Sequence, residues 1–283
     1  MINIIADTLC GIPQNEQAKL GIPFVSQMII IMGKTYREGI DIDSPTFIKK
    51  LKTSAELPKT AAPPPEDYIP LFRKLARKGD TAIVIAPSKD MSGTFHSATV
   101  AKHEFPDADI RIVDTRTIAG GLGSIVLQSL YWVKAGWNAD RIVAAINSMA
   151  QRERVFFLVD TLEYLQKGGR IGNASALVGT VMQIKPILTL HDGKIENYEK
   201  IRTKTAGLAR LKELVERSCP RRPESWLSVA HCSAYKPAME LAEDFKQVMG
   251  FKYIPIYEVP PAIVVHGGTN LLSVSFFVEE SLS

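Results

Sequence analysis

The residues best suited to chemistry in this sequence stand where a buried strand gives way to a helix. Ser92, Gly93 and Thr94 follow the apolar run at 81–86 and a short polar turn. Hydroxyl groups at such a junction can supply a nucleophile, cap the helix, or hold an anion at the electropositive helix N-terminus. Each of these roles needs different partner residues elsewhere in the chain.

The residues around Ser92 do not match the strand-to-helix turn of the α/β-hydrolases. That turn is G-x-S-x-G, whereas residues 89–93 read KDMSG. A nucleophile also needs a base within reach, and His96 lies one turn into the same predicted helix and points along its flank. The pattern favours an N-cap, which is worth about 1 kcal/mol, or an anion cradle in which Gly93 admits a ligand close to the backbone. These two roles are compatible.

Metal and nucleotide chemistry lack their usual residues in this sequence. The histidines are at positions 96, 103, 191, 231 and 266. They do not cluster and no H-E-x-x-H motif is present, so we predict no metal site. The sequence has no Walker motif, and GGRIGNASALVG does not follow a strand with Rossmann spacing. We therefore expect no nucleotide cofactor and assign no catalytic residue within this chain.

The composition is that of an ordinary globular protein. The chain has 283 residues, of which 46% are hydrophobic and 23% charged, and this length favours two domains. A net charge of +4 is too small and too scattered to predict a nucleic-acid partner. Three widely spaced cysteines fit a reducing compartment, and the most apolar run, residues 24–32, is too short to span a bilayer. We expect a cytoplasmic protein with at most transient membrane contact.

Strands and helices alternate in the first half of the chain. Apolar strands are predicted at 2–7 and 81–86, among others, with helices between and after them. Because these strands lack polar alternation, they predict a parallel sheet covered on both faces. We predict an N-terminal three-layer α/β/α domain with a mainly parallel sheet over residues 1–152. Ligands bind such sheets beyond the carboxyl ends of the strands, where we expect Ser92 and Thr60 to lie.

The second half predicts a C-terminal α/β domain with a mixed sheet over residues 153–283. RVFFLVDT and LLSVSFFVEE have the composition of strands, and helices are predicted near 204–217 and 237–249. After the first of these strands, an apolar helix precedes a hairpin whose turn is at 191–193. The whole chain is therefore predicted to form two α/β domains.

Several motifs together resemble the DegV family. The segment SKDMSGTFHSA resembles that family's S-x-x-[LM]-S-G-T-x-x-S-A, and the opening IIADTLCGIP resembles its D-S-[TA]-x-D-[LI]-P start. VDTLEYLQKGGRIG, IKPILTLHDGKI and KIRTKTAGLARL are similar to its later blocks and occur in the same order. The similarity covers essentially the whole chain, and its most specific part runs from Val159 to Arg202.

The resemblance implies a two-domain α/β protein that binds a long-chain fatty acid and needs no cofactor. In bacteria, members of this family act as the fatty-acid-binding subunit of a fatty acid kinase. The chain would hold the acyl tail in its C-terminal domain while a separate ATP-using kinase subunit phosphorylates the carboxylate. The product would be an acyl phosphate for phospholipid synthesis. The apolar residues of the C-terminal domain serve equally well as plain core.

The resemblance also assigns roles to individual residues. Three segments match the family's positions that hydrogen-bond the fatty-acid carboxylate: the threonine of T-S-Q-P, the start of S-G-T and the histidine of H-x-G-P-G. In this sequence they are Thr60, Ser92 with Gly93, and His266. Arg202 matches an arginine associated with phosphoryl transfer and the partner kinase, and Arg170 is a second candidate for that role.

The chain departs from the family pattern beside the expected carboxylate site. TAAPPP at 60–65 replaces T-S-Q-P-S, HGGT at 266–269 replaces H-x-G-P-G, and Gly11 stands where aspartate is usual. These changes leave the identity of the acyl-like ligand open. Two alternatives therefore stay open as well: a stand-alone hydrolase or acyltransferase that uses Ser92, and a lipid-responsive regulatory protein with a different ligand.

Overall fold

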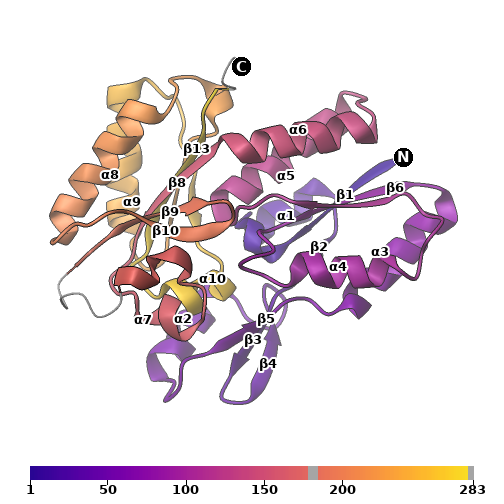
Figure 1. Ribbon diagram of the computed structural model, residues 1–283, viewed down its shortest axis with the longest axis horizontal. Helices are drawn as coiled ribbons and strands as arrows, with labels where there is room; N and C mark the ends of the chain where they lie inside the picture. Colours follow the sequence, from indigo (N-terminus) through magenta and orange to yellow (C-terminus); the bar gives the residue numbers. More distant parts are fainter. Residues whose placement is uncertain (178–183, 280–283) are drawn as a thin grey trace. The chain divides into compact units, whose positions relative to one another are not determined.

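The computed structural model describes residues 1–177 and 184–279 (Figure 1). The chain divides into two compact units, residues 1–151 with 260–262 and residues 152–259 with 263–283. The N-terminal unit contains two β-sheets and the C-terminal unit one, and each unit has its own packed helices. The predicted α/β fold class with two domains is confirmed. Among the described residues, no helix is long and apolar enough to cross a bilayer.

A four-stranded parallel sheet forms the centre of the N-terminal unit, in the order β2-β1-β6-β7. Its strands are β1 (Ile2–Asp7), β2 (Phe24–Val25), β6 (Thr81–Ala86) and β7 (Ile110–Asp114). The register pairs Ile5 with Val84 and Ile85 with Val113. The carboxyl ends of β1 and β6 therefore meet at one edge of the sheet, where ligand sites of parallel sheets form.

Helices cover this sheet on both faces, as Figure 1 shows. On one face, α3 (Pro65–Lys78) and α4 (Thr94–Lys102) pack through Phe72 and Ala98 against Val84. Because successive strand residues point to opposite faces, Ile83 and Ile85 face the other way. There α5 (Ala119–Lys134), followed by α6 (Ala139–Arg152), contacts β1 and β6. The predicted three-layer arrangement is confirmed.

A second, antiparallel sheet of three strands was not predicted. It has the order β4-β3-β5, with β3 (Met28–Ile31), β4 (Lys34–Arg37) and β5 (Lys59–Ala61). The apolar run at 24–32 therefore supplies two different sheets, because only its first two residues pair with β1. Thr60 lies inside β5, opposite Ile29, rather than in a loop after an element.

Two further helices connect the strands of the N-terminal unit, α1 (Gln14–Leu20) before β2 and α2 (Ser44–Thr53) between β4 and β5. The N-cap of α2 is Asp43, whose side chain accepts the N–H of Thr46. The Ser-Pro pair at 44–45 marks the start of the helix, as expected for proline in a first turn. A short 3₁₀ helix, η1 (Thr8–Cys10), follows β1 directly.

The C-terminal unit is built on a six-stranded mixed sheet in the order β10-β9-β8-β13-β11-β12. All of its neighbouring strands are antiparallel except β11 and β12. The strands are β8 (Glu153–Leu158), β9 (Ile187–His191), β10 (Lys194–Glu199), β11 (Ser228–His231), β12 (Ile256–Glu258) and β13 (Leu272–Phe277). The mixed sheet predicted for this half is confirmed. Asp192 and Gly193 both have positive φ, as a two-residue hairpin turn between β9 and β10 requires.

Two long helices cover one face of this sheet, α8 (Lys204–Ser218) and α9 (Tyr235–Met249). Their side chains form one core with Phe156, Leu158 and Val274 from the central strands. The shorter elements are α7 (Glu163–Lys167), η2 (Gly172–Leu177), η3 (Pro223–Ser225) and α10 (Pro261–Gly267). The apolar helix predicted before the hairpin falls largely on residues 178–183, outside the described residues.

Candidate functional site

Ser92 lies in the loop that connects β6 to α4, at the carboxyl edge of the parallel sheet. Its N–H donates to the carbonyl of Ser88 at 2.9 Å, and its hydroxyl accepts the N–H of Thr94 at 3.3 Å. The N-cap of α4 is Gly93, which makes no side-chain capping bond. The cap predicted at Ser92 is therefore displaced by one residue. Ser92 instead holds the loop in a local turn of the kind that serine hydroxyls form.

A buried polar cluster lies behind Ser92. The carboxylate of Asp7, at the end of β1, accepts the hydroxyl of Thr94 at 2.8 Å and the N–H of Leu9 at 2.9 Å. The side-chain amide of Gln27 donates at 2.8 Å both to Asp7 and to Thr94. Asp7, Gln27 and Thr94 are all buried. The cluster fixes Thr94, and Thr94 in turn contacts the Ser92 hydroxyl at 3.0 Å.

The hydroxyl protons of this cluster can be counted. Thr94 has a single hydroxyl proton, and it uses this proton to donate a hydrogen bond to the carboxylate of Asp7. The contact between the hydroxyls of Thr94 and Ser92 must then use the proton of Ser92. In this arrangement the Ser92 hydroxyl points inward, and it donates to a ligand only after turning outward. The hydrogen bonds run from Ser92 to Thr94 and from Thr94 to Asp7. His96, the histidine nearest in sequence, is exposed on α4 and takes no part in them.

Thr60 and Gly93 belong to neighbouring segments of the N-terminal unit. A methyl group at Gly93 would lie only 3.2 Å from the Cβ of Ala62, two residues after Thr60. The altered TAAPPP segment therefore runs directly beside the start of α4. A bulkier side chain at either position would push the two segments apart, because Cβ contacts below 3.4 Å are rare. The N-terminal unit thus brings Ser92 and Gly93 close to the segment that follows Thr60.

Glu38 is a buried carboxylate that sequence reasoning missed. It is 4% exposed, and its Oε1 accepts the N–H of Ala262 at 2.7 Å. A side-chain hydrogen bond from Thr8 also reaches this carboxylate, and both bonds lower the pKa of Glu38. Burial, and then the nearby negative charge of Asp7, raise the pKa of Glu38 to about 7. Burial likewise raises the pKa of Asp7 to about 6, against the hydrogen bonds that it accepts.

In the C-terminal unit, His266 occupies the end of α10 and packs against the end of α7. A Cβ at Gly168 would lie 2.1 Å from the Nδ1 of His266, so only glycine fits beneath this ring. Arg170 donates from Nη1 to the carbonyl of Gly168 at 2.8 Å. Burial, and then the positive charge of Arg170, lower the pKa of His266 to about 4. The imidazole is therefore neutral near pH 7.

Two residues in and just after the HGGT segment, Gly268 and Asn270, have a left-handed backbone. Gly268, with φ of 75°, stands at the first glycine of H-x-G-P-G, and a Cβ there would lie 2.7 Å from the Cδ2 of Tyr164. Asn270 stands at the second glycine and has φ of 60°. Asparagine tolerates this left-handed region better than most residues. Both left-handed positions of this turn are therefore occupied by residue types that tolerate positive φ.

The two arginines that were grouped in the sequence occupy different places. Arg170 lies beside His266, where its charge affects the imidazole. Arg202 is exposed in the turn between β10 and α8. The structure therefore associates Arg170 with the histidine rather than with Arg202. Among the described residues, no group of three or more His, Cys, Asp or Glu side chains is placed to hold a metal ion.

A family profile and individual relatives both match this chain to the DegV family. A family profile described as "uncharacterised protein, DegV family" matches residues 1–279. A DegV domain-containing protein of Streptomyces coelicolor is 33% identical, over 96% of this chain and 97% of the relative. A DegV domain-containing protein of Clostridium perfringens is 29% identical, over 97% of this chain and 98% of the relative.

Solved structures resemble the whole chain. A DegV family protein from Thermus thermophilus, described in terms of fatty acid binding, has a TM-score of 0.91 at 25% identity and covers 98% of this chain and 99% of its own. A fatty acid binding DegV family protein from Streptococcus agalactiae has a TM-score of 0.89 at 28% identity, with 99% of each chain covered. DegV of Bacillus subtilis, described as a fatty acid binding protein, has a TM-score of 0.87 at 26% identity, over 98% of this chain and 99% of its own.

Glu38→Gln is expected to stabilise the protein increasingly as pH rises. The folded-state pKa of Glu38 is about 7 against 4.5 for an ordinary glutamate, so its ionisation costs stability as pH rises from about 4.5 to about 7. Glutamine keeps an oxygen for the Ala262 N–H and cannot ionise. The free energy of unfolding of the variant, relative to the wild type, should therefore rise by roughly 2–3 kcal/mol between about pH 5 and about pH 8.

Urea unfolding at the two pH values measures this difference. Glu56→Gln, at an exposed position, is the matched control and should show no such rise. A difference between Glu38→Gln and the wild type that does not change with pH would contradict the raised pKa.

Proposed function

The chain belongs to the DegV family, and we propose that it binds a long-chain fatty acid. The observation that carries the proposal is the likeness, over at least 98% of this chain, to structures described as fatty acid binding. The local chemistry around Ser92 and around His266 supports it, because both regions present hydrogen-bond donors suited to a carboxylate.

In this proposal, the carboxylate is held by hydroxyl, peptide and imidazole groups. Thr60, Ser92 and the N–H of Gly93 are the donors of the N-terminal unit, at the electropositive start of α4. The hydroxyl of Ser92 rotates so that it donates a hydrogen bond to the ligand, while its oxygen still accepts the N–H of Thr94. A carboxylate that loses water must regain hydrogen bonds of this strength merely to offset the cost of dehydration.

His266 contributes a donor without a fixed charge, since its pKa near 4 leaves the imidazole neutral. The positive charge comes from Arg170, which we assign to the carboxylate rather than to the partner surface. A bound carboxylate would stabilise the imidazolium and thereby raise the pKa of His266. Whether the imidazole is neutral or protonated, only glycine fits at position 168 beneath the ring.

The acyl tail supplies most of the affinity. Each buried CH₂ contributes about 0.8 kcal/mol, so fourteen methylenes contribute about 11 kcal/mol before the costs of association. We assign the tail to the C-terminal domain, residues 153–283, which is rich in buried aromatic and aliphatic side chains. The side chains between the sheet and α8 and α9 form a packed core, and an inserted tail would have to displace some of them.

We infer that the chain is a non-catalytic subunit that presents the fatty acid to a separate ATP-using kinase in the cytoplasm. The inward hydrogen bond from Ser92 to Thr94 supports this reading over a serine hydrolase, because a nucleophile needs a base at its own hydroxyl. Arg202 is exposed and can reach a partner, where a guanidinium would neutralise the charge of a transferring phosphoryl group. The acyl phosphate formed there would enter phospholipid synthesis.

Ser92→Ala is expected to weaken the binding of hexadecanoic acid by roughly 10- to 100-fold, because one hydrogen bond to a charged group is lost. Binding of hexadecanol, which has the same tail and no carboxylate, should change far less. Calorimetric titration of both ligands measures the difference. Ser97→Ala, on the same helix, is the control and should bind both ligands like the wild type. Equal losses for acid and alcohol in Ser92→Ala would contradict the carboxylate role.

Arg202→Ala is expected to leave hexadecanoic acid binding unchanged and to reduce acyl phosphate formation with a fatty acid kinase at least tenfold. The reason is that the side chain is exposed on the turn before α8 rather than placed beside His266. Lys200→Ala, two residues earlier and also exposed, is the control. Loss of the bound acid in Arg202→Ala would refute this division between binding and transfer.

A further inference from the structure

The first turn of helix α10 is held by a buried carboxylate from a distant part of the chain. The helix follows Pro260 and begins with Pro261, and proline has no N–H, so Ala262 presents the first backbone N–H of α10. The Oε1 of Glu38 accepts this N–H at 2.7 Å. Glu38 and Ala262 both belong to the N-terminal unit and are 4% and 3% exposed. A buried N–H in a first helical turn needs an acceptor from outside the helix, and Glu38 supplies it.

Glu38 is itself fixed at both its backbone and its side chain. It follows β4 directly, and its N–H donates to the carbonyl of Gln27 at 2.9 Å. It also forms a β-bridge with Ile42. Thr8 donates a hydrogen bond to its carboxylate, while the oxygen of Thr8 accepts the N–H of Gln27 at 3.1 Å. The acceptor for the Ala262 N–H therefore has a defined place in the N-terminal unit.

These contacts connect Glu38 with the polar cluster behind Ser92. The residue that receives the Glu38 N–H, Gln27, also donates from its side-chain amide to Asp7 and to Thr94, at 2.8 Å in each case. Thr94 in turn contacts the hydroxyl of Ser92 at 3.0 Å. One continuous hydrogen-bonded network therefore includes both the Ser92 loop and the start of α10.

The same helix carries His266 near its other end. α10 has seven residues, so it is only about 10 Å long, and residues four apart in an α-helix, such as Ala262 and His266, are neighbours on successive turns. A displacement of the first turn therefore displaces the imidazole. The ring has little room for such a shift, because a Cβ at Gly168 would lie 2.1 Å from its Nδ1. The place of His266 thus depends on how the helix begins.

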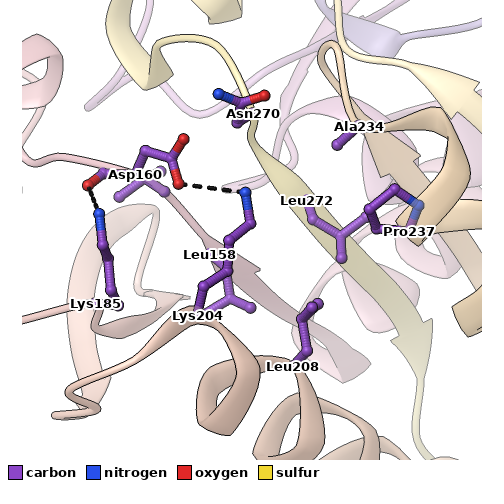
Figure 2. Close-up of a pocket in the computed structure, with 10 residues that line it drawn as sticks. Leu158, Asp160, Lys185, Lys204, Leu208, Ala234, Pro237, Asn270 and Leu272 are labelled. Carbon is purple, nitrogen blue, oxygen red and sulfur yellow. Dashed lines mark hydrogen bonds and ion pairs between the residues drawn. The ribbon is translucent and has the colours of Figure 1, made fainter.

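The contacts of Glu38 hold a backbone group rather than neutralise a charge. Its hydrogen-bond donors are one hydroxyl and one peptide N–H. Asp160 in the C-terminal unit shows the other arrangement, since Lys204 lies 3.3 Å from its carboxylate and Lys185 donates to its carbonyl (Figure 2). A neutral amide at position 38 would keep an acceptor for the peptide N–H and leave no cation unpaired. Glu38→Gln is therefore the conservative variant.

We propose that Glu38 is a positioning residue for the fatty-acid carboxylate. It does not touch the ligand; it holds the first turn of α10 and thereby sets where His266 presents its imidazole. The inference rests on the proposed function, in which His266 is a donor to the carboxylate. It adds that one hydrogen-bonded network positions the donors at Ser92 and at His266.

Glu38→Met removes the acceptor, keeps a side chain of similar length, and is expected to weaken hexadecanoic acid binding by roughly tenfold or more. Binding of hexadecanol, which has no carboxylate, should change far less. Glu38→Gln keeps the acceptor for Ala262 and should bind both ligands like the wild type. Calorimetric titration measures all of these affinities. Wild-type affinity for the acid in Glu38→Met, or equal losses for acid and alcohol, would overturn the proposal.

A double-mutant cycle with His266→Ala separates positioning from a general loss of structure. If Glu38 acts through His266, Glu38→Met should weaken acid binding much less in the His266→Ala background than in the wild type. Equal losses in the two backgrounds would overturn the proposal. Thr8→Val removes the other donor to the Glu38 carboxylate, and the same cycle applies to it if Glu38→Met does not fold.

The NMR signals of the His266 ring, recorded without ligand, test the positioning apart from the proposed function. They should shift in Glu38→Met and stay close to the wild type in Glu38→Gln. Unchanged ring signals in Glu38→Met would overturn the role of Glu38 even if the protein binds hexadecanoic acid. A wild type that binds no such acid would instead refute the proposed function, whatever the ring signals show.

Discussion

The buried carboxylate of Asp7 organises the chemistry of the N-terminal unit. It sits at the carboxyl end of β1 and accepts hydrogen bonds from Thr94, Gln27 and the Leu9 backbone. These bonds fix the start of α4 and, through Thr94, the hydroxyl of Ser92. A buried carboxylate is expensive unless its lone pairs are satisfied, so the surrounding donors and the carboxylate depend on one another.

This constraint also decides what Ser92 can do. In the proposed role, the Ser92 hydroxyl, which contacts the Thr94 hydroxyl at 3.0 Å, holds an anion and does not attack an ester. In the C-terminal unit, burial keeps the imidazole of His266 neutral, and Arg170 lies beside it. Donors and a positive charge, without an activated nucleophile, are what a protein needs to hold a carboxylate and leave it unreacted.

Local sequence patterns predicted the features that depend on local physics. Apolar runs predicted the parallel sheet, and the Asp-Gly pair predicted the hairpin between β9 and β10. Features that depend on distant contacts were missed, such as Glu38, whose partner Ala262 lies 224 positions away. The association of Arg170 with His266 depends on Gly168, whose lack of a side chain has meaning only once the ring above it is placed. The small sheet of β3 was missed because its short strands are fixed by pairing rather than by pattern.

Native mass spectrometry of the protein, purified from bacteria without added lipid, tests the central claim most directly. If a carboxylate and its tail are held as proposed, the protein should carry a non-covalent fatty acid of roughly 14–18 carbons, because each buried methylene adds to retention. Solvent extraction should release that acid intact. Protein that is consistently empty, even after incubation with such acids, would contradict the account.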